Sequence, residues 1–351
     1  MIPRVLQVMA GAETGGAETA FADMVLALHE AGVPQQVVTR KNTRNESLIQ
    51  AGIPVFTLPF GSLIDIYTSF ALRGIIRRFK PDIVQTWMSR AAQHTPADKK
   101  HYMKVSRLGG YYKMKYFRTT DYFTTITPKI RDYLTENGVS PAHVRHINNF
   151  AEVPQDTAPV TRESLNTPEN AFVVLALSRL HKAKGLDTLI KTVAPLKNTH
   201  VWLAGEGPDR EKLEALAQAE GAANRIHFLG WRDDRDALLK ACDAVAFPSR
   251  YEPFGTTFVQ AWAARKPLVT TASDGPAAFV RDGEDGLMVP IDNIDALREA
   301  IDRLQKDSAR QTKLINNGWQ RYQNEFTKTR AVEAYLDYYR HILRAEGLRL
   351  E

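Results

Sequence analysis

Short apolar and β-branched runs alternate with helix-period patterns along most of this chain, and this alternation limits the folds open to it. Between the runs, apolar side chains recur at helical spacing, as in Leu186, Leu189 and Val193. Runs connected in this way predict parallel strands, in sheets that helices cover on both faces. The runs span residues 5–9, 36–39, 55–58, 83–86, 123–126 and 144–147, and then 172–177, 200–204, 226–229, 244–247 and 268–270.

Two such series fit within the 351 residues, so the chain is expected to be an α/β protein of two doubly wound, Rossmann-like domains. The polar, proline-bearing stretch 152–160 is the predicted boundary. We therefore expect one domain at residues 1–155 and a second at 156–329. The last helix, 330–351, has Val332, Tyr335 and Tyr339 on one face and is expected to cross back onto the first domain.

The net charge of +6 is unevenly distributed along the chain. Residues 1–155 carry 19 Lys/Arg and 12 Asp/Glu, a balance of +7, whereas residues 156–351 carry 27 and 28, a balance of −1. The excess in the first half indicates an anionic partner there.

Cysteine usage and hydropathy suggest a cellular compartment. Cys242 is the single cysteine, which excludes an internal disulfide, and its apolar neighbours indicate a buried, unreactive thiol. No apolar run reaches the roughly 18 residues of a membrane span, and the first strand begins too early for a signal peptide. We expect a cytoplasmic protein, peripheral to the cytoplasmic face of the inner membrane.

An acidic residue followed by a Pro-Phe-Gly turn and an apolar helix is the strongest functional signal. Glu252 precedes Pro253-Phe254-Gly255, and the helix pattern then runs through Thr256 and Gln260. A helix N-terminus has unpaired N–H groups and a partial positive charge, and so attracts phosphates. Glu252 stands where it could hold a neutral, hydroxyl-rich group, and the combination suits a sugar joined to a diphosphate.

Basic residues follow the strand expected at 172–177. Arg179 and Lys184 flank the strand-to-helix turn Ser178–Gly185. Arg can grip phosphate with two hydrogen bonds, and Lys adds a point charge. A solvated cationic loop would look the same by charge alone; together with the helix start near Phe254, phosphate binding is favoured.

Glycine-rich turns end two further strands. Gly11, Gly15 and Gly16 follow the first strand, and Gly205-Glu206-Gly207 follows the run at 200–204. Glycines let backbone N–H groups approach a ligand closely, although plain tight turns explain each motif nearly as well. The first turn has neither the G-x-G-x-x-G spacing of a dinucleotide site nor the Lys-Ser/Thr of a Walker A loop.

A basic segment without acidic residues extends from Lys99 to Arg118, with aromatic residues interleaved. Such a segment suits an anionic membrane or a phosphorylated glycolipid, although nucleic acid and a solvated face are alternatives. Anionic acceptor or membrane contact is favoured. Its seven cations are Lys99, Lys100, Lys104, Arg107, Lys113, Lys115 and Arg118.

Two other charged segments are interpreted as structural. The basic amphipathic helix expected at 72–80, with Arg73, Arg77 and Arg78, is explained as an ordinary covering helix. The acidic run 233–236 is interpreted as capping the helix that follows it and pairing with its dipole, because these roles are simpler than a metal-bound diphosphate. No metal site is expected.

Taken together, these motifs resemble the retaining family 4 glycosyltransferases of GT-B architecture, two Rossmann-like domains facing across a cleft. The resemblance is strongest across residues 170–300. It rests on four segments in order, 15–18, 178–185, 204–208 and 248–255, supported by 148–150 and 282–290.

The resemblance implies roles for individual residues. Arg179 and Lys184 would hold the donor diphosphate, and Glu252 would bond the donor sugar at the reacting centre. These three are the expected catalytic residues. The expected donor-binding set adds Gly15, Gly16, Gly205, Glu206, Phe254, Gly255, Thr256 and Gln260.

Two departures from the family pattern stand out. Gln260 occupies the position of a second Glu, which usually contacts the nucleotide ribose; Gln can still hydrogen-bond a hydroxyl, but without charge. The family's mid-domain His has no match near residues 105–110.

The resulting expectation is transfer of a sugar from a UDP-, GDP- or ADP-sugar to a saccharide or glycolipid hydroxyl, with retained configuration and no cofactor or nucleic acid. A lipopolysaccharide-core or other anionic acceptor is preferred. The alternatives are a catalytically silent nucleotide-sugar binder, an enzyme with a soluble acceptor, and a dehydrogenase, against which the missing G-x-G-x-x-G spacing argues.

Overall fold

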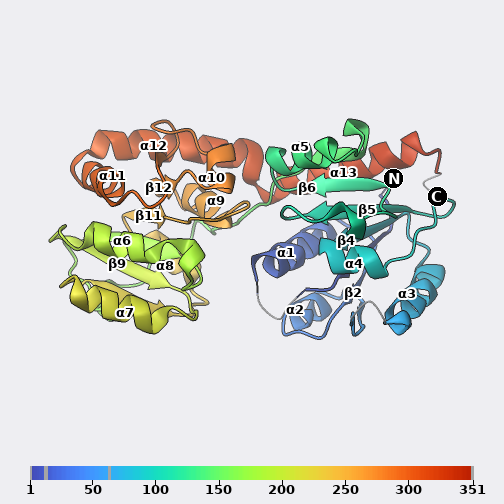
Figure 1. Ribbon diagram of the computed structural model, residues 1–351, viewed down its shortest axis with the longest axis horizontal. Coiled ribbons are helices and arrows are strands. Elements are labelled where there is room, and N and C mark those ends of the chain that lie inside the picture. Colours follow the sequence, from blue (N-terminus) through green and yellow to red (C-terminus); the bar gives the residue numbers. More distant parts are fainter. Residues whose placement is uncertain (1, 12–14, 62–64, 349–351) are drawn as a thin grey trace. The chain divides into compact units, whose positions relative to one another are not determined.

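The computed structural model describes residues 2–11, 15–61 and 65–348, and it divides into two compact units (Figure 1). Unit 1 consists of residues 1–149 together with 328–351, and unit 2 is the intervening stretch 150–327. The sequence placed the first boundary between residues 155 and 156, inside what is here unit 2.

Unit 1 is built on a parallel sheet. Within its described residues the strands are in the order β3-β2-β1-β4-β5-β6-β7. The strands are β1 (Val5–Met9), β2 (Gln35–Thr39), β3 (Val55–Thr57), β4 (Ile83–Trp87), β5 (Met103–Leu108), β6 (Tyr122–Thr125) and β7 (Val144–His146). The helices are α1 (Gly16–Glu30), α2 (Asn45–Gln50), α3 (Ile66–Phe79), α4 (Met88–His94), α5 (Pro128–Glu136) and α13 (Lys328–Ala345), with 3₁₀ turns η1 (Met114–Tyr116) and η2 (Pro141–His143).

Unit 2 repeats the design with a second parallel sheet. Its described strands follow the order β10-β9-β8-β11-β12-β13. The strands are β8 (Phe172–Leu177), β9 (Thr199–Ala204), β10 (Ile226–Gly230), β11 (Ala244–Phe247), β12 (Leu268–Thr271) and β13 (Leu287–Val289). The helices are α6 (Leu186–Val193), α7 (Arg210–Ala219), α8 (Arg235–Ala241), α9 (Thr256–Ala263), α10 (Asp274–Phe279), α11 (Ile294–Lys306) and α12 (Ser308–Arg321), with η3 (Glu163–Leu165), η4 (Lys182–Lys184) and the π-helical η5 (Tyr322–Phe326).

The predicted class of fold is confirmed, and the sequence missed two strands. β13 lies within residues 282–290, a segment that resembles the family but was not predicted to be a strand. β5 lies inside the basic segment 99–118, where charge concealed a strand that pairs with β4 on one side and β6 on the other. All its residues are buried, because a central strand of a parallel sheet is covered on both faces.

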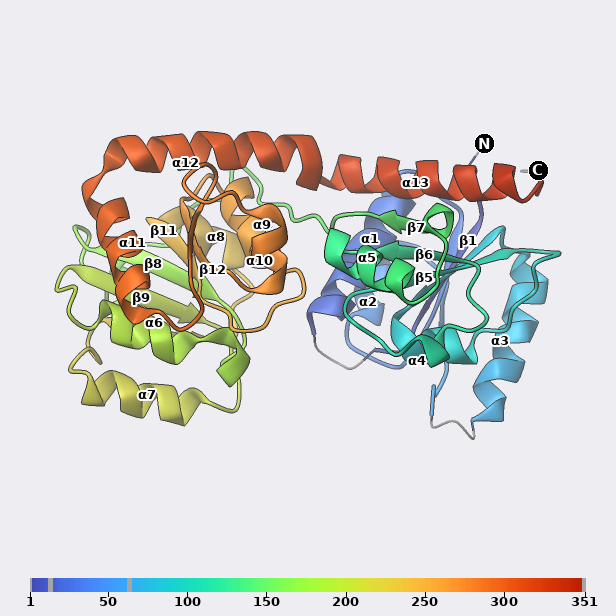
Figure 2. The same cartoon turned by 45° about the horizontal axis from the view of Figure 1, so that its top comes forward.

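The last helix belongs to unit 1, as the sequence predicted (Figure 2). In α13 the Tyr339 hydroxyl donates to Gln85 Oε1 on β4 at 3.0 Å. Beyond the helix end, Glu346 accepts from the Tyr122 hydroxyl on β6 at 2.6 Å. Buried tyrosine hydroxyls usually have a hydrogen-bond partner, and these two bonds hold α13 and the residues after it against the sheet.

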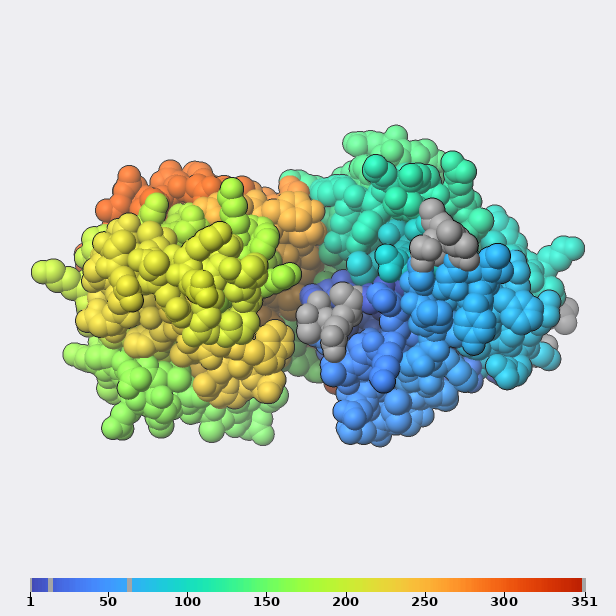
Figure 3. Space-filling model, turned by 60° about the horizontal axis from the view of Figure 1, so that its bottom comes forward, coloured from blue at the N-terminus to red at the C-terminus, as the bar shows by residue number. Residues whose placement is uncertain are grey.

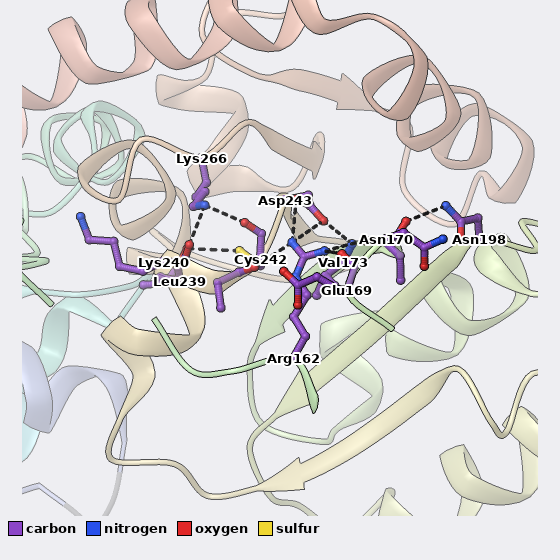
Figure 4. Close-up of polar contacts among 12 residues, drawn as sticks. Arg162, Glu169, Asn170, Val173, Asn198, Leu239, Lys240, Cys242, Asp243 and Lys266 are labelled. Carbon is purple, nitrogen blue, oxygen red and sulfur yellow. Dashed lines mark hydrogen bonds and ion pairs between the residues drawn. The ribbon is translucent and has the colours of Figure 1, made fainter. Parts of the chain in front are cut away.

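Arg162, in the stretch before β8, is bound to residues near the amino ends of the unit 2 strands (Figure 4). The Arg162 guanidinium pairs with Asp243, just before β11, and donates to the carbonyl of Ala171 at 2.7 Å. Asp243 in turn accepts from the backbone N–H of Val173 at 2.7 Å. Beside this cluster, burial raises the pKa of the Cys242 thiol to about 12, which agrees with an unreactive cysteine. Among the described residues no helix is long and apolar enough to span a membrane.

Candidate active site

The predicted donor motifs that belong to unit 2 meet at the carboxyl edge of its sheet. β8 and β11 are neighbours there, although they are far apart in the chain, so the strand order reverses between them. Open parallel sheets bind ligands at this switch point, outside the carboxyl ends of the strands. Residues 178–185 follow β8 and residues 248–255 follow β11, while the turns after β9 and β12 flank them.

Glycines bring these loops into direct backbone contact. A Cβ added at Gly185 would lie 2.1 Å from the Pro248 carbonyl oxygen, and one at Gly205 would lie 2.1 Å from that of Ser178. A Cβ at Gly275 would come within 2.0 Å of the Phe254 carbonyl oxygen. Since real Cβ atoms do not approach so closely, only glycine allows the four loops to pack at this distance. Two of these glycines, Gly185 and Gly275, lay outside the predicted site.

Arg250 joins the same loops through its side chain. Its guanidinium donates to both carboxylate oxygens of Asp187, at 2.8 and 2.7 Å, and Nε donates to Asp292 at 2.7 Å. Nη1 also donates to the Lys182 carbonyl at 2.7 Å. These hydrogen bonds raise the pKa of Arg250 and lower that of Asp292. Paired, bidentate bonds are the strong ones, so Arg250 fixes the loop after β8 against the loop after β11.

Lys184 and Glu252 lie at the centre of this arrangement. The Lys184 ammonium donates to Glu252 Oε2, and both side chains are mostly buried, at 24% and 15% exposed. The structure therefore brings together two residues that are 68 positions apart and that the sequence singled out separately.

Arg179 and the start of α9 add positive charge to the same sheet edge as Lys184. The Arg179 side chain is exposed and, within the described ranges, has no ion-pair partner. Gly255 is the N-cap of α9 with φ of 84°, a left-handed conformation in which a side chain would also strike the Phe247 ring. The start of a helix has N–H groups without intrahelical partners and a partial positive charge, and this helix start lies at the carboxyl edge of the sheet, in the segment after β11.

Three buried serine hydroxyls are a feature that the sequence did not reveal. Ser178, Ser249 and Ser273 follow β8, β11 and β12, and their Oγ atoms have no hydrogen-bond partner among the described residues. Ser249 and Ser273 are almost fully buried. Native proteins rarely leave buried hydroxyls unpaired. Three of them at one sheet edge indicate a place where a polar ligand or water completes the bonding.

The other predicted donor residues of unit 2 have mixed surroundings. Glu206 is exposed and pairs with Arg210 one helical turn later, although its carbonyl accepts from the N–H of Leu180 at 3.0 Å. The Phe254 ring is buried in an aromatic cluster with Phe258 and Phe279, so only its backbone is available. Gln260, Gly205 and Thr256 are placed on α9 or the β9 turn as predicted, and Gln260 is largely buried.

The acidic run before α8 is ion-paired. Asp234 is the N-cap residue, but its side chain accepts no capping hydrogen bond from the helix. Instead Arg232 donates to both its carboxylate oxygens, at 2.7 and 2.6 Å, and Arg235 pairs with Asp236. The expected capping hydrogen bond is therefore absent, whereas Asp234 at the N-cap and Asp236 in the first turn lie where pairing with the helix dipole was predicted.

In unit 1 the glycine turn after β1 leads into α1. Gly15 is the N-cap of α1 and Gly16 its first residue, while residues 12–14 lie outside the described part of the chain. A Cβ at Gly15 would meet the Glu18 carboxylate at 2.3 Å, whereas one at Gly16 would meet nothing. The Glu18 carboxylate ends a flexible side chain that could move aside, so the structure does not require glycine at Gly15, and the roles of Gly15 and Gly16 towards a donor stay predictions.

Two of the seven basic residues predicted to contact an acceptor or membrane are interior residues. Lys104 is 0% exposed, and its ammonium donates to the carbonyls of Ala92 and Thr95 at 2.6 and 2.7 Å. Arg107 is 3% exposed, stacks 4.4 Å from the Trp87 ring centre and donates to Asn149. Both belong to β5, so the prediction is corrected there, since a buried cation cannot contact a membrane. The remaining five are exposed: Lys99, Lys100, Lys113, Lys115 and Arg118.

A cavity of about 550 Å³ opens at the carboxyl edge of the unit 1 sheet. It is lined by Gly11 after β1, Arg40 and Lys41 after β2, and residues 57–59 at the end of β3. Both cations are exposed and have no ion pair within the described ranges. The sequence reasoning missed this cavity, although two adjacent cations directly after a strand could have signalled it.

Two family models together cover most of the chain. Residues 158–321 match "Glycosyl transferases group 1", and residues 14–153 match "Glycosyltransferase Family 4". The two matches correspond to unit 2 and unit 1.

Two similar relatives, both from Rhizobium meliloti (strain 1021), are named lipopolysaccharide core biosynthesis glycosyltransferases. LpsE is 35% identical over 325 residues, 92% of this chain and 95% of the relative. LpsD is 33% identical over 337 residues, 95% of this chain and 97% of the relative.

Among solved structures, Anabaena Alr3699/HepE in complex with UDP and glucose has a similar fold. Its TM-score is 0.82 at 20% identity, over 97% of this chain and all of the neighbour. The two Rossmann-like sheets and the returning α13 are those of the GT-B architecture. The chain therefore belongs to the family 4, group 1 glycosyltransferases and is itself a glycosyltransferase.

Proposed function

We propose that this enzyme moves a sugar from a nucleoside diphosphate sugar to a hydroxyl of a lipopolysaccharide-core saccharide. The observation that carries the proposal is the Lys184–Glu252 pair, held at the switch point of unit 2 beside Arg179 and the start of α9. Cations for a diphosphate and a carboxylate for sugar hydroxyls are thus adjacent on one sheet edge.

The cationic side would stabilise the leaving group. As the bond to the sugar breaks, the diphosphate gains negative charge while the sugar carbon becomes cation-like. Arg179, Lys184 and the N-terminus of α9 lie on the side where that negative charge would develop. Lys184 and the helix start are held in place before the reaction, and such preorganised charges are the largest single source of catalysis in many enzymes.

Glu252 would have a different task. Its side chain has two oxygens that can accept hydrogen bonds from sugar hydroxyls and support the developing positive charge. The unpaired hydroxyls of Ser178, Ser249 and Ser273 supply further polar contacts at the same edge. Glu252 belongs on the sugar side and Lys184 on the phosphate side of the bond that breaks.

The names of the relatives support a lipopolysaccharide-core saccharide as the acceptor. Both LpsE and LpsD act in lipopolysaccharide core biosynthesis by their names, and they match nearly the whole chain. The cavity of unit 1, with the unpaired cations Arg40 and Lys41, has the charge to receive a phosphorylated core sugar. An enzyme with this acceptor would work at the cytoplasmic face of the inner membrane.

The donor is tested by thermal stability. A ligand at a hundred times its Kd stabilises a protein by about 2.7 kcal/mol, so UDP-, GDP- and ADP-sugars can be compared with NAD in one panel. One class of nucleotide sugar should raise Tm, and Lys184→Ala should abolish the shift. A shift with NAD alone, or none with any nucleotide sugar, would refute the proposal.

The acceptor and the stereochemistry need a second assay. Purified core saccharide with and without its phosphates is offered with the donor that binds, and the product is examined by NMR. The family resemblance implies retained anomeric configuration. Transfer that favours a neutral, soluble sugar would refute the acceptor proposal, and no transfer or hydrolysis at all would favour the silent binder.

A further inference from the structure

Helix α3 has an exposed face with an unusual composition. Ile66, Tyr67 and Phe70 are 78%, 64% and 72% exposed. Single exposed apolar residues are ordinary, but three large ones within the first five residues of one helix form a patch. The other side of α3, with Leu72, Ile75, Ile76 and Phe79, is buried in the core of unit 1.

The exposed face continues into positive charge. Ile66, Phe70, Arg73 and Arg77 follow one another at i, i+4, i+7 and i+11, which places them on one stripe of the helix. Arg73, Arg77 and Arg78 are exposed, and no residue between Ile66 and Phe79 is acidic. The stripe is therefore apolar in its first half and cationic in its second.

Neighbouring segments extend the same charge. The Ser69 hydroxyl donates to the carbonyl of His94 at 3.0 Å, which ties α3 to the end of α4. The loop after α4 carries the exposed Lys99 and Lys100. Figure 3 shows α3, in light blue, on the surface of unit 1 beside the teal residues that follow it. Lys99 lies 3.2 Å from Asp121, and Asp65 and Asp98 border the same segments, so the positive charge of this face comes mainly from the arginines of α3 and from Lys100.

We propose that this face of α3 docks on an anionic lipid bilayer, with Ile66, Tyr67 and Phe70 entering the headgroup boundary and Arg73, Arg77 and Arg78 meeting the lipid phosphates. Charge complementarity selects this occupant, because apolar and aromatic residues beside cations on one helix face are the composition of interfacial helices. Aromatic rings suit the headgroup level, and exposed basic residues are drawn to anionic lipid. The inference rests on the proposed lipid-linked acceptor, since only such an acceptor requires the enzyme at a membrane.

The docking face differs from the one expected from the sequence. That prediction chose the segment 99–118 and explained the helix at 72–80 as a covering helix. α3 is a covering helix on one side, but its first turns lie upstream of the residues considered, where Ile66, Tyr67 and Phe70 are exposed. Lys104 and Arg107 drop out of the docking surface because they are buried.

The experiment measures binding of the full chain to vesicles of phosphatidylcholine, with and without phosphatidylglycerol. Wild-type protein should sediment with the anionic vesicles alone. The double variants Ile66→Ser/Phe70→Ser and Arg73→Glu/Arg77→Glu should each weaken that binding about tenfold or more, in line with the loss of apolar insertion or of charge. Both pairs face solvent, and a thermal melt verifies that the variants fold.

Matched variants make the result specific. Ile49→Ser removes an exposed apolar residue from α2, and Lys191→Glu/Lys313→Glu reverses two exposed charges of unit 2. Both should bind vesicles like the wild type. Equal losses in these controls would mean a nonspecific charge or solubility effect and would overturn the proposal.

The remaining outcomes are also decisive. Wild-type binding without anionic lipid, no binding at all, or full binding by the α3 variants would each overturn it. A change from dimer to monomer in Ile66→Ser/Phe70→Ser would show instead that the patch joins two copies. Nucleotide-sugar hydrolysis without vesicles should be unchanged in the α3 variants, so that failure of docking is distinguished from failure of the proposed reaction.

Discussion

Two cations at the donor site of unit 2 are held by carboxylates, whereas the cations at the cavity and on α3 of unit 1 are not. In unit 2, Lys184 and Arg250 are joined to carboxylates, and the loops that carry them touch backbone to backbone through glycines. In unit 1, Arg40 and Lys41 beside the cavity and Arg73 and Arg77 on α3 have no ion pairs within the described ranges and extend into solvent. A site fixed in advance suits the one chemical feature that all donors share, a diphosphate. Exposed cations suit larger anionic partners that vary.

The largest effect should come from the pair at the switch point. Lys184→Ala and Glu252→Ala are each expected to reduce turnover by at least about a hundredfold, the range for removal of one preorganised charge or donor. Initial rates with saturating donor measure it. Lys182→Ala, an exposed lysine in the same loop, is the control and should retain activity. Near-normal rates in either of the first two variants would show that unit 2 is not the site of chemistry.

The second test compares two glycines with the same backbone conformation. Gly185 and Gly221 have φ of 63° and 66°, but only Gly185 has a carbonyl oxygen in the place of a Cβ. Gly221→Ala should cost about 1 kcal/mol of unfolding free energy, from the left-handed conformation. Gly185→Ala should cost about 2 kcal/mol more, from overpacking. Urea denaturation gives both values, and equal losses would mean that the loops are not locked together.

The third test concerns the residue that joins the loops. Arg250→Met should raise the KM for donor about tenfold while the pH profile stays unchanged, because Arg250 holds the loops that carry Lys184 and Glu252 through its bonds to Asp187, Asp292 and the Lys182 carbonyl. Arg250→Lys should restore little, since one ammonium cannot replace a bidentate guanidinium. Asp292→Asn keeps the Asp187 bonds and should have a smaller effect. If the three variants differed only in Tm, Arg250 would be a purely structural residue.

The smallest effects should separate buried from exposed basic residues in unit 1. Lys104→Met leaves the Ala92 and Thr95 carbonyls without their donor and should cost about 1 kcal/mol of unfolding free energy or more. Lys113→Met, on an exposed residue of the same segment, should stay within about 0.5 kcal/mol. Similar values for the two would contradict the burial of β5.

Most features that the sequence predicted come from patterns among residues close together in the chain. Helical spacing and β-branched runs predicted both sheets, and the motifs at 178–185 and 252–260 predicted donor residues because each motif is continuous in the chain. β5 was missed because its charges outweighed its apolar residues, Met103, Val105 and Leu108. Lys104 is buried because β4 and β6 pair with β5 on either side, and a pattern read within β5 alone cannot show this.

The features that could not be predicted depend on distant partners. Arg250 is 63 residues from Asp187 and 42 from Asp292, so the sequence offers no spacing that joins them. The unpaired hydroxyls of Ser178, Ser249 and Ser273 become visible only when three strand ends are adjacent. Family resemblance supplied roles for Arg179 and Lys184, but it gave no sign of the exposed apolar residues at the start of α3.

The glycine contacts between the loops restrict how such an enzyme can diversify. At Gly185, Gly205 and Gly275 a neighbouring carbonyl oxygen occupies the place of a Cβ, so these loops have no room for larger residues there. New sugar preferences must then arise from outward side chains such as Tyr251, which is 55% exposed next to Glu252. Libraries that randomise those tips, and preserve every loop length, would sample the substrates that this scaffold can acquire.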